Sequence, residues 1–112
     1  MQPQGHVQVL LGQVVGGLSA QEALDAPRVC IGAGMPDEGD VYDLRVFAEE
    51  GMPEETVKGL KELGHKVEVV KGMARGMFGR GQIIRWSVDE VDKTGLWSAG
   101  SDFRGDGAAY PA

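Results

Sequence analysis

The chain contains one cysteine, no long apolar run and fewer basic than acidic residues, and each shortage excludes a class of protein. Cys30 has no second cysteine to pair with, so a fold held by internal disulfides is excluded. No apolar stretch approaches the roughly 20 residues of a membrane-spanning helix, and no targeting segment is recognisable, so no compartment is predicted. The formal net charge of −6 disfavours nucleic acid and anionic membranes as partners.

The chain is instead rich in glycine, with 18 glycines in 112 residues against a usual frequency of about 7%. So much glycine predicts tight turns and close backbone approaches. The hydrophobic content of 42% and the charged content of 25% are ordinary for a globular protein and exclude a disordered tail. The length allows at most one domain.

The N-terminal residues open directly into an apolar helical run over residues 7–15. The apolar residues of one helix face are Val7, Leu10, Leu11 and Val14, spaced i, i+3, i+4 and i+7. Because chain termini are normally the least packed part of a fold, a helix that requires burial on more than one side is unusual there. We therefore expect residues 1–112 to be the C-terminal, incomplete segment of a larger domain. A true translation start at Met1 would instead favour a free-standing module.

The order of helix and strand signals predicts an α+β fold with a largely antiparallel sheet. A capping box at residues 19–22 (SAQE) begins a second helix, and Pro53 and Gly64 bound a third. Short β-branched or alternating segments predict the strands, and residues 89–95 close a hairpin between the last two. The expected helices cover residues 7–15, 19–26 and 53–63, and the expected strands cover residues 28–31, 41–47, 66–70, 82–88 and 96–100.

Four acidic residues between two predicted strands could offer oxygens to a calcium ion. They are Asp37, Glu38, Asp40 and Asp43. Their spacing does not reproduce the alternating ligands and terminal glutamate of an EF-hand loop. A solvated acidic loop is the default interpretation, and cation binding between Asp37 and Asp43 stays open.

Two further patterns have ordinary structural interpretations. Cys30 with His6 or His65 could suggest a thiol nucleophile, but a lone cysteine in an apolar strand is usually a small buried hydrophobe. Gly32 and Gly34 follow a strand, as in a dinucleotide loop, but the third glycine and the helix start are missing.

A basic stretch could mimic an RNA-binding segment. Its basic residues are Lys71, Arg75, Arg80 and Arg85. The acidic net charge favours a loop packed on an acidic neighbour instead. The adhesion tripeptide at residues 104–106 (RGD) is a short chance match, and its glycine more plausibly lets a closing turn pack tightly.

No nucleophile in the sequence has a recognisable activating partner. Thr56 belongs to a predicted surface helix, and Thr94 belongs to a predicted hairpin turn. We therefore predict no catalytic, substrate-binding, cofactor-binding or metal-ligating residue within the chain.

Several blocks of the sequence nevertheless resemble one enzyme family, the gamma-glutamyltransferases (gamma-glutamyltranspeptidases, glutathione hydrolases). The blocks are residues 3–11 (PQGHVQVLL), 21–28 (QEALDAPR), 54–67 (EETVKGLKELGHKV) and 101–109 (SDFRGDGAA). The resemblance spans essentially the whole chain and is to the C-terminal part of that family's small subunit.

The resemblance implies an N-terminal-nucleophile hydrolase, a four-layer αββα sandwich that needs no cofactor. In that family self-cleavage exposes a threonine whose own amine acts as base. The threonine attacks a gamma-glutamyl amide, and the acyl-enzyme passes the gamma-glutamyl group to water or to an amino acid or peptide. The threonine and the paired glycines of the oxyanion hole precede Met1 in the family pattern, so none of these roles transfers to a residue of this chain.

The resemblance therefore implies that the segment supports an active site supplied by the remainder of its own enzyme. Two alternatives remain. The chain could be a non-catalytic binding or scaffolding module derived from that fold, or it could belong to a family member specialised for another amide, such as an acylase substrate.

Overall fold

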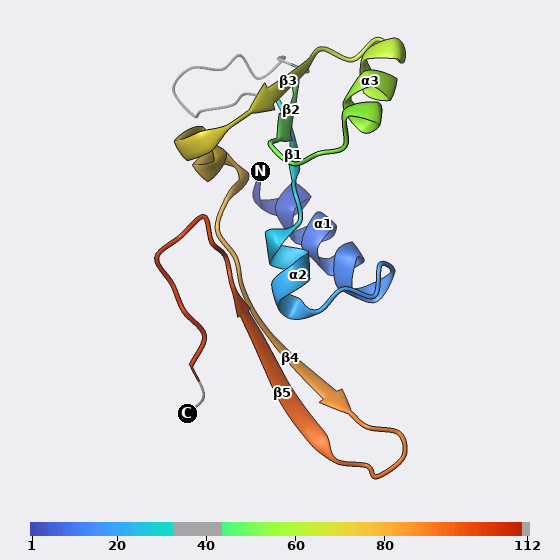
Figure 1. Cartoon of the computed structure of the whole chain (residues 1–112), viewed down its shortest axis with the longest axis vertical. Helices are drawn as coiled ribbons and strands as arrows, with labels where there is room; N and C mark the ends of the chain where they lie inside the picture. The colour runs from blue at the N-terminus through green and yellow to red at the C-terminus, as the bar shows by residue number, and fades with distance from the viewer. Residues whose placement is uncertain (33–43, 111–112) are drawn as a thin grey trace. The chain divides into compact units, whose positions relative to one another are not determined.

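The computed structural model describes residues 1–32 and 44–110, which divide into two compact units (Figure 1). Unit 1 comprises residues 1–8 and 26–79, and unit 2 comprises residues 9–25 and the chain from residue 80 onwards. Helix α1 (Gln2–Val14) contributes its first turns to unit 1 and the remainder to unit 2. It begins five residues earlier than predicted, because Pro3 is tolerated in a first turn, where backbone N–H groups have no intrahelical acceptor.

Unit 1 contains a three-stranded sheet in the order β1-β2-β3. Its strands are β1 (Val29–Ile31), β2 (Val46–Glu49) and β3 (Val67–Val70). β1 pairs with β2 antiparallel, whereas β2 pairs with β3 parallel. The parallel pair requires a crossover, which helix α3 (Glu54–Glu62) provides. The α+β class is as predicted, and antiparallel pairing predominates among the described strands once the hairpin of unit 2 is included.

The prediction for β2 was wrong in its bounds. The alternation of residues 41–47 predicted a half-buried strand, but Leu44 and Arg45 are not in a strand and residues 41–43 lie outside the described residues. β2 begins at Val46 because both neighbours pair with it from there, at Ile31 and Val67. All four residues of β2 are buried, as in a central strand that is covered on both faces and therefore shows no alternation.

Helix α3 begins and ends one residue inside its predicted range of 53–63. Pro53 occupies the N-cap position rather than the predicted first helical one, with φ −53° and ψ 133°. The helix ends at Glu62, and Gly64 terminates it with a φ of +92° that is accessible to glycine, while the amide of His65 donates to the carbonyl of Leu60. Val57 and Leu60 are half-buried, consistent with their predicted inward face.

The hydrophobic core of unit 1 gathers around Phe78, which is almost fully buried. The segment after β3, predicted only as a connection, contains the 3₁₀ helix η1 (Gly72–Phe78). Its last residue packs with Cys30, Phe47 and Val70. Met1 and Met77 are partly buried against this cluster.

Unit 2 consists of the hairpin β4 (Gln82–Val88) and β5 (Gly95–Ser101), with helix α2 (Ala20–Asp25) packed on it. The predicted capping box begins α2: the amide of Ser19 donates to Glu22 Oε2 at 2.8 Å, and the amide of Glu22 donates to Ser19 Oγ at 3.2 Å. α2 approaches β5 closely at Gly100, where a Cβ atom would lie 2.9 Å from the backbone of Ala20.

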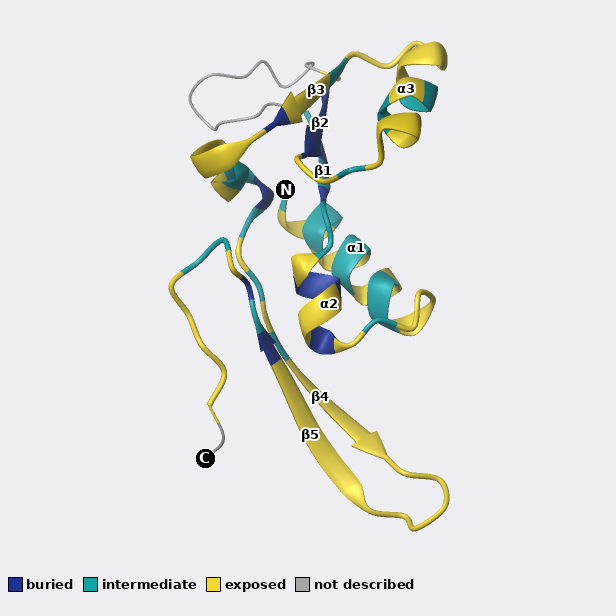
Figure 2. Ribbon diagram, in the orientation of Figure 1, coloured by how far each residue is buried: buried dark blue, intermediate teal, exposed yellow. Residues whose placement is uncertain are grey.

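Large apolar residues remain exposed in both units. The ribbon coloured by burial shows most of the hairpin as exposed (Figure 2). α1 contains no buried residue, although its predicted apolar face is well formed. On the hairpin, the face opposite Gly100 carries four exposed apolar side chains, Ile84, Trp86, Val88 and Trp97. No helix in the described ranges has the length and hydropathy that crossing a bilayer requires.

Candidate functional site

The two threonines of the chain, Thr56 and Thr94, are the first candidates for a nucleophile. Thr56 lies exposed in α3, and Thr94 lies in the hairpin turn, where its hydroxyl and amide bond the carboxylate of Asp92. Both threonines thus lie in the elements predicted for them. That the chain has no catalytic residue stays a prediction.

The acidic residues proposed as an optional cation site lie outside the described residues. They are Asp37, Glu38, Asp40 and Asp43. Gly34 lies there too, while Gly32 ends β1 with φ +111°. Within residues 1–32 and 44–110, no group of three or more His, Cys, Asp and Glu side chains is arranged to hold a metal ion.

Cys30 is a core residue. Its side chain is buried with Phe47, Val70 and Phe78, whereas His6 and His65 are exposed. The interpretation of Cys30 as a small buried hydrophobe is confirmed, because a thiol in this position is shielded from both imidazoles and from solvent.

The predicted basic stretch is divided between the two units. Arg75 donates to the carbonyl of Gly72 and lies 3.9 Å from the carboxylate of Glu50, an acidic neighbour in the same unit. Arg80 donates from Nε to the carbonyl of Arg104. Arg75 thus has the acidic neighbour that the packed-loop interpretation predicted, whereas Lys71, Arg80 and Arg85 are exposed.

An open groove of about 480 Å³ lies beside α3 and β3 in unit 1. Side chains of both signs line it, among them Glu50, Glu54, Lys58, Lys61 and Lys71. The side chains of this group are all exposed to solvent. The groove thus differs from typical ligand sites, which are concave, mostly apolar and enclosing.

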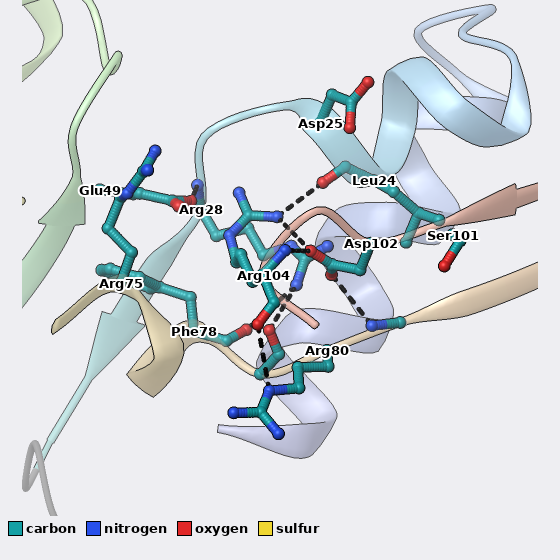
Figure 3. Close-up of polar contacts among 12 residues, drawn as sticks. Leu24, Asp25, Arg28, Glu49, Arg75, Phe78, Arg80, Ser101, Asp102 and Arg104 are labelled. Carbon is teal, nitrogen blue, oxygen red and sulfur yellow. Dashed lines mark hydrogen bonds and ion pairs between the residues drawn. The ribbon is translucent and has the colours of Figure 1, made fainter. Parts of the chain in front are cut away.

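The principal polar anchor of unit 1 is Arg28 with Glu49, both buried (Figure 3). The amide of Arg28 donates to Glu49 Oε2 at 2.9 Å, and the amide of Glu49 donates to the carbonyl of Arg28. Arg28 Nη1 donates to the carbonyls of Phe78 and Gly79 at 3.2 and 3.3 Å. One arginine therefore fixes the end of η1 beside β1, and η1 in turn delivers Phe78 to the core.

The corresponding anchor of unit 2 is the buried pair Asp102 and Arg104 (Figure 3). Asp102 Oδ2 accepts from the amide of Gly81 at 2.9 Å, and Oδ1 accepts from the amide and Nη1 of Arg104. Arg104 Nη1 also donates to the carbonyl of Leu24 at 2.8 Å. Residues 102–104 thereby connect the start of β4, through Gly81, to the end of α2, through Leu24. The tripeptide at residues 104–106 cannot act as an adhesion motif with its arginine buried in this way.

A third polar arrangement joins α1 to the outer edge of β1. Gln4 Oε1 accepts from the amide of Ile31 at 2.8 Å, and Gln4 Nε2 donates to the carbonyl of Ile31 at 2.9 Å. Gln8 makes the same two bonds with Val29, both at 2.8 Å. We call Gln4 and Gln8 the glutamine pair.

Three exposed carboxylates have pKa values below their ordinary values. Hydrogen bonds from the backbone and hydroxyl of Ser19 lower the pKa of Glu22. The amides of Val91 and Asp92 lower the pKa of Asp89, and the hydroxyl and amide of Thr94 lower the pKa of Asp92. Each lowered pKa reflects hydrogen bonds within a local turn or helix cap.

Sequence reasoning missed all three polar anchors. The closing block at residues 101–109 was noted for its resemblance, but nothing in its composition predicts that Asp102 and Arg104 are buried together. The glutamine pair had a usable signal, because Gln4 and Gln8 are spaced i, i+4 on one helix face. Their partners on β1 are distant in sequence and could not be inferred.

Both the sequence and the fold of this chain are similar to those of known proteins. The sequence profile of the gamma-glutamyltranspeptidase family matches residues 1–112. A curated relative, the glutathione hydrolase-like YwrD proenzyme of Bacillus subtilis (strain 168), is 35% identical over 109 residues, 96% of this chain. The chain spans only 19% of that protein's length.

Solved structures have the same fold. The cephalosporin acylase of Bacillus halodurans is 38% identical, with a TM-score of 0.70 over 98% of this chain and 18% of its own. A mutant gamma-glutamyltranspeptidase of Helicobacter pylori matches with a TM-score of 0.68 and 19% identity, over 91% of this chain and 47% of its own. These neighbours confirm the predicted fold class, an α+β part of the N-terminal-nucleophile hydrolase sandwich.

Proposed function

Because the chain belongs to the gamma-glutamyltranspeptidase family, we propose that it acts as the supporting segment of a larger enzyme that cleaves gamma-glutamyl amide bonds. In this proposal residues 1–112 form an incomplete domain. The remainder of the same enzyme supplies a threonine nucleophile and its amine base farther upstream. It also supplies the backbone donors of an oxyanion hole directly before α1. The gamma-glutamyl group passes from the threonine ester to water or to an amino acid or peptide.

The observation that carries this proposal is the exposed apolar surface on elements that are otherwise well formed. On α1, Val7, Leu10, Leu11 and Val14 are each more than half exposed. A regular amphipathic helix with no buried residue presents an apolar face on which another helix or sheet can pack. Contiguous exposed apolar surface of this kind marks an interaction site.

The hairpin supports the same conclusion independently. One face of β4 and β5 carries α2, which buries Ala20, Ala23 and Leu24. The opposite face carries the tilted ring pair Trp86 and Trp97, with centroids 4.8 Å apart and both rings partly exposed. A sheet covered by a helix on one face and apolar on the other is suited to a further layer, as in an αββα sandwich.

The chemistry assigned to the larger enzyme follows from general principles. The amine of an N-terminal residue titrates near neutrality, so it can accept the proton of its own hydroxyl as that hydroxyl attacks the amide carbon. Backbone N–H groups then stabilise the oxyanion until the intermediate collapses to the threonine ester. The N-terminal ammonium returns its proton to the nitrogen of the amine that leaves. The segment's contribution is to hold the elements that carry those groups in place.

The test compares the 112-residue chain with the enzyme that carries it, using gamma-glutamyl-p-nitroanilide as the donor. We expect release of p-nitroaniline by the enzyme and none by the chain alone. Turnover by the pure chain would overturn the supporting role, and an inactive enzyme would overturn the gamma-glutamyl assignment. A reading frame that begins at Met1 would favour the free-standing module instead.

One observation favours a second candidate, an acylase for a different amide. Among the structural neighbours, the cephalosporin acylase is 38% identical to this chain, whereas the gamma-glutamyltranspeptidase is 19% identical. Assaying the same enzyme with gamma-glutamyl-p-nitroanilide and with a cephalosporin side-chain amide separates the two. A kcat/KM at least tenfold higher for the cephalosporin would assign the acylase activity.

A further inference from the structure

The glutamine pair mimics a neighbouring strand along the outer edge of β1. Each side-chain amide of the pair, like a peptide unit, presents one acceptor and one donor, and each exchanges two hydrogen bonds with a single strand residue. The four distances of 2.8 to 2.9 Å are those of well-formed N–H···O bonds. Gln8 Nε2 also donates to the carbonyl of Gln4 at 3.0 Å, which links the two side chains.

The match depends on the spacing of the two elements. Residues four apart on a helix rise by about 6 Å, and residues two apart on a strand are separated by about 6.6 Å. Gln4 and Gln8 can therefore reach Ile31 and Val29 together only when α1 runs alongside β1 in this register. Cys30 lies between Val29 and Ile31 in β1 and pairs with Phe47 of β2, at the opposite edge of the strand. A shift of α1 by one residue would break all four bonds.

These bonds are the specific attachment of the first turns of α1 to the sheet of unit 1. The helix has no buried residue that could fix its position by packing within the described part of the chain. The bonds of Gln8 are partly buried, so water competes with them less than it does with the exposed bonds of Gln4. Together with Met1, which packs partly against the core, these two side-chain amides hold the N-terminal end of α1 in position.

We infer that Gln4 and Gln8 are positioning residues for the reaction of the larger enzyme. They hold α1 on the edge of β1 and so fix the backbone N–H groups that directly precede the helix. This inference rests on the proposed function, which places the oxyanion donors immediately before α1. A displacement of about 1 Å in such a group is enough to reduce turnover by as much as 100-fold.

The experiment replaces the glutamine pair by methionine in the enzyme that carries this chain. Methionine has nearly the same length and volume and cannot make the bonds. For Gln4→Met combined with Gln8→Met, we expect kcat on gamma-glutamyl-p-nitroanilide, normalised to self-cleaved enzyme, to fall about 10- to 100-fold, while KM stays within about twofold. A ground-state binding role would raise KM instead.

Amide hydrogen exchange gives a second readout that does not depend on activity. The amides of Val29 and Ile31 are the two that the glutamine oxygens protect, and we expect both to exchange at least tenfold faster in the double variant. Gln13→Met is the matched control, since Gln13 lies on the same helix outside the pair. We expect wild-type exchange and wild-type kcat from it.

Each outcome supports or overturns a defined statement. Faster exchange together with a lower kcat supports the inference, whereas faster exchange with an unchanged kcat overturns the positioning role. Unchanged exchange overturns the attachment itself. An inactive wild-type enzyme overturns the proposed function, and this inference with it. If the double variant does not fold, Gln4→Met and Gln8→Met are measured singly, and a loss in kcat below about threefold in both would overturn the inference.

Discussion

The carboxylate of Asp102 and the guanidinium of Arg104 meet at 2.9 Å, with about 1% of each side chain exposed. Two residues that are nearly adjacent in sequence thus form a buried ion pair, and both also bond the main chain of unit 2. A charge buried in this way is stable only while its partner and its hydrogen bonds remain.

We expect Arg104→Met to lower the free energy of unfolding by about 3 to 5 kcal/mol, because it leaves the carboxylate of Asp102 buried without its cation. Urea denaturation of the enzyme that carries this chain measures the change. Asp106→Asn is the control, since Asp106 lies in the same segment but is exposed. A loss of less than 1 kcal/mol for Arg104→Met would contradict the structural role of the pair.

A second prediction concerns the contact between α2 and β5. We expect Gly100→Ala to destabilise the protein by about 1 to 3 kcal/mol, because its methyl group would lie 2.9 Å from the backbone carbonyl carbon of Ala20 and force the helix away. Gly59→Ala is the matched control on α3. Its methyl group meets nothing within 4 Å, and we expect a gain of about 0.5 to 1 kcal/mol because alanine favours a helix interior. Opposite shifts in melting temperature confirm the argument, and equal shifts contradict it.

A third prediction concerns the acid sensitivity of the hairpin turn. Asp89 Oδ1 accepts from the amides of Val91 and Asp92, which holds its pKa below the ordinary value of 3.8. A carboxylate whose pKa is lowered on folding stabilises the folded state above its unfolded pKa, and this contribution is lost as the pH falls through the folded pKa. We therefore expect Asp89→Ala to lower the melting temperature at pH 6.

The difference in melting temperature between wild type and Asp89→Ala should shrink as the pH falls below 3.8, where the wild-type carboxylate begins to be protonated. Val91→Ala, a change at an exposed side chain of the same turn that does not titrate, serves as the control, and its difference from wild type should not depend on pH. A difference that stays constant from pH 6 to pH 2.5 would show that the carboxylate charge does not stabilise the turn.

Local signals predicted most of the elements in this chain. Ser19 and Glu22 predicted the start of α2, and Gly64 predicted the end of α3. The alternation in β4 and the polar residues 89–95 predicted the hairpin. Each of these depends on residues close together in sequence, so propensity and periodicity were sufficient.

The errors arose where distant partners determine the structure. β2 begins at Val46 because Ile31 and Val67 pair with it there, and neither partner can be recognised from the alternation of residues 41–47. η1 was missed because a glycine-rich segment is not a helix former, and its conformation is fixed by Phe78 in the core and by Arg28 on its last carbonyls. Arg28 and the glutamine pair were unpredicted for the same reason. Asp102 and Arg104 are close in sequence, but the main-chain groups of Gly81 and Leu24 that they bond are distant.

The glutamine pair also has a consequence for how this sheet can be enlarged. An unprotected outer strand invites pairing with another chain, and the main-chain groups of Val29 and Ile31 that would recruit one are already engaged. The glutamine pair therefore closes the β1 edge of the described sheet to edge-to-edge association with another chain.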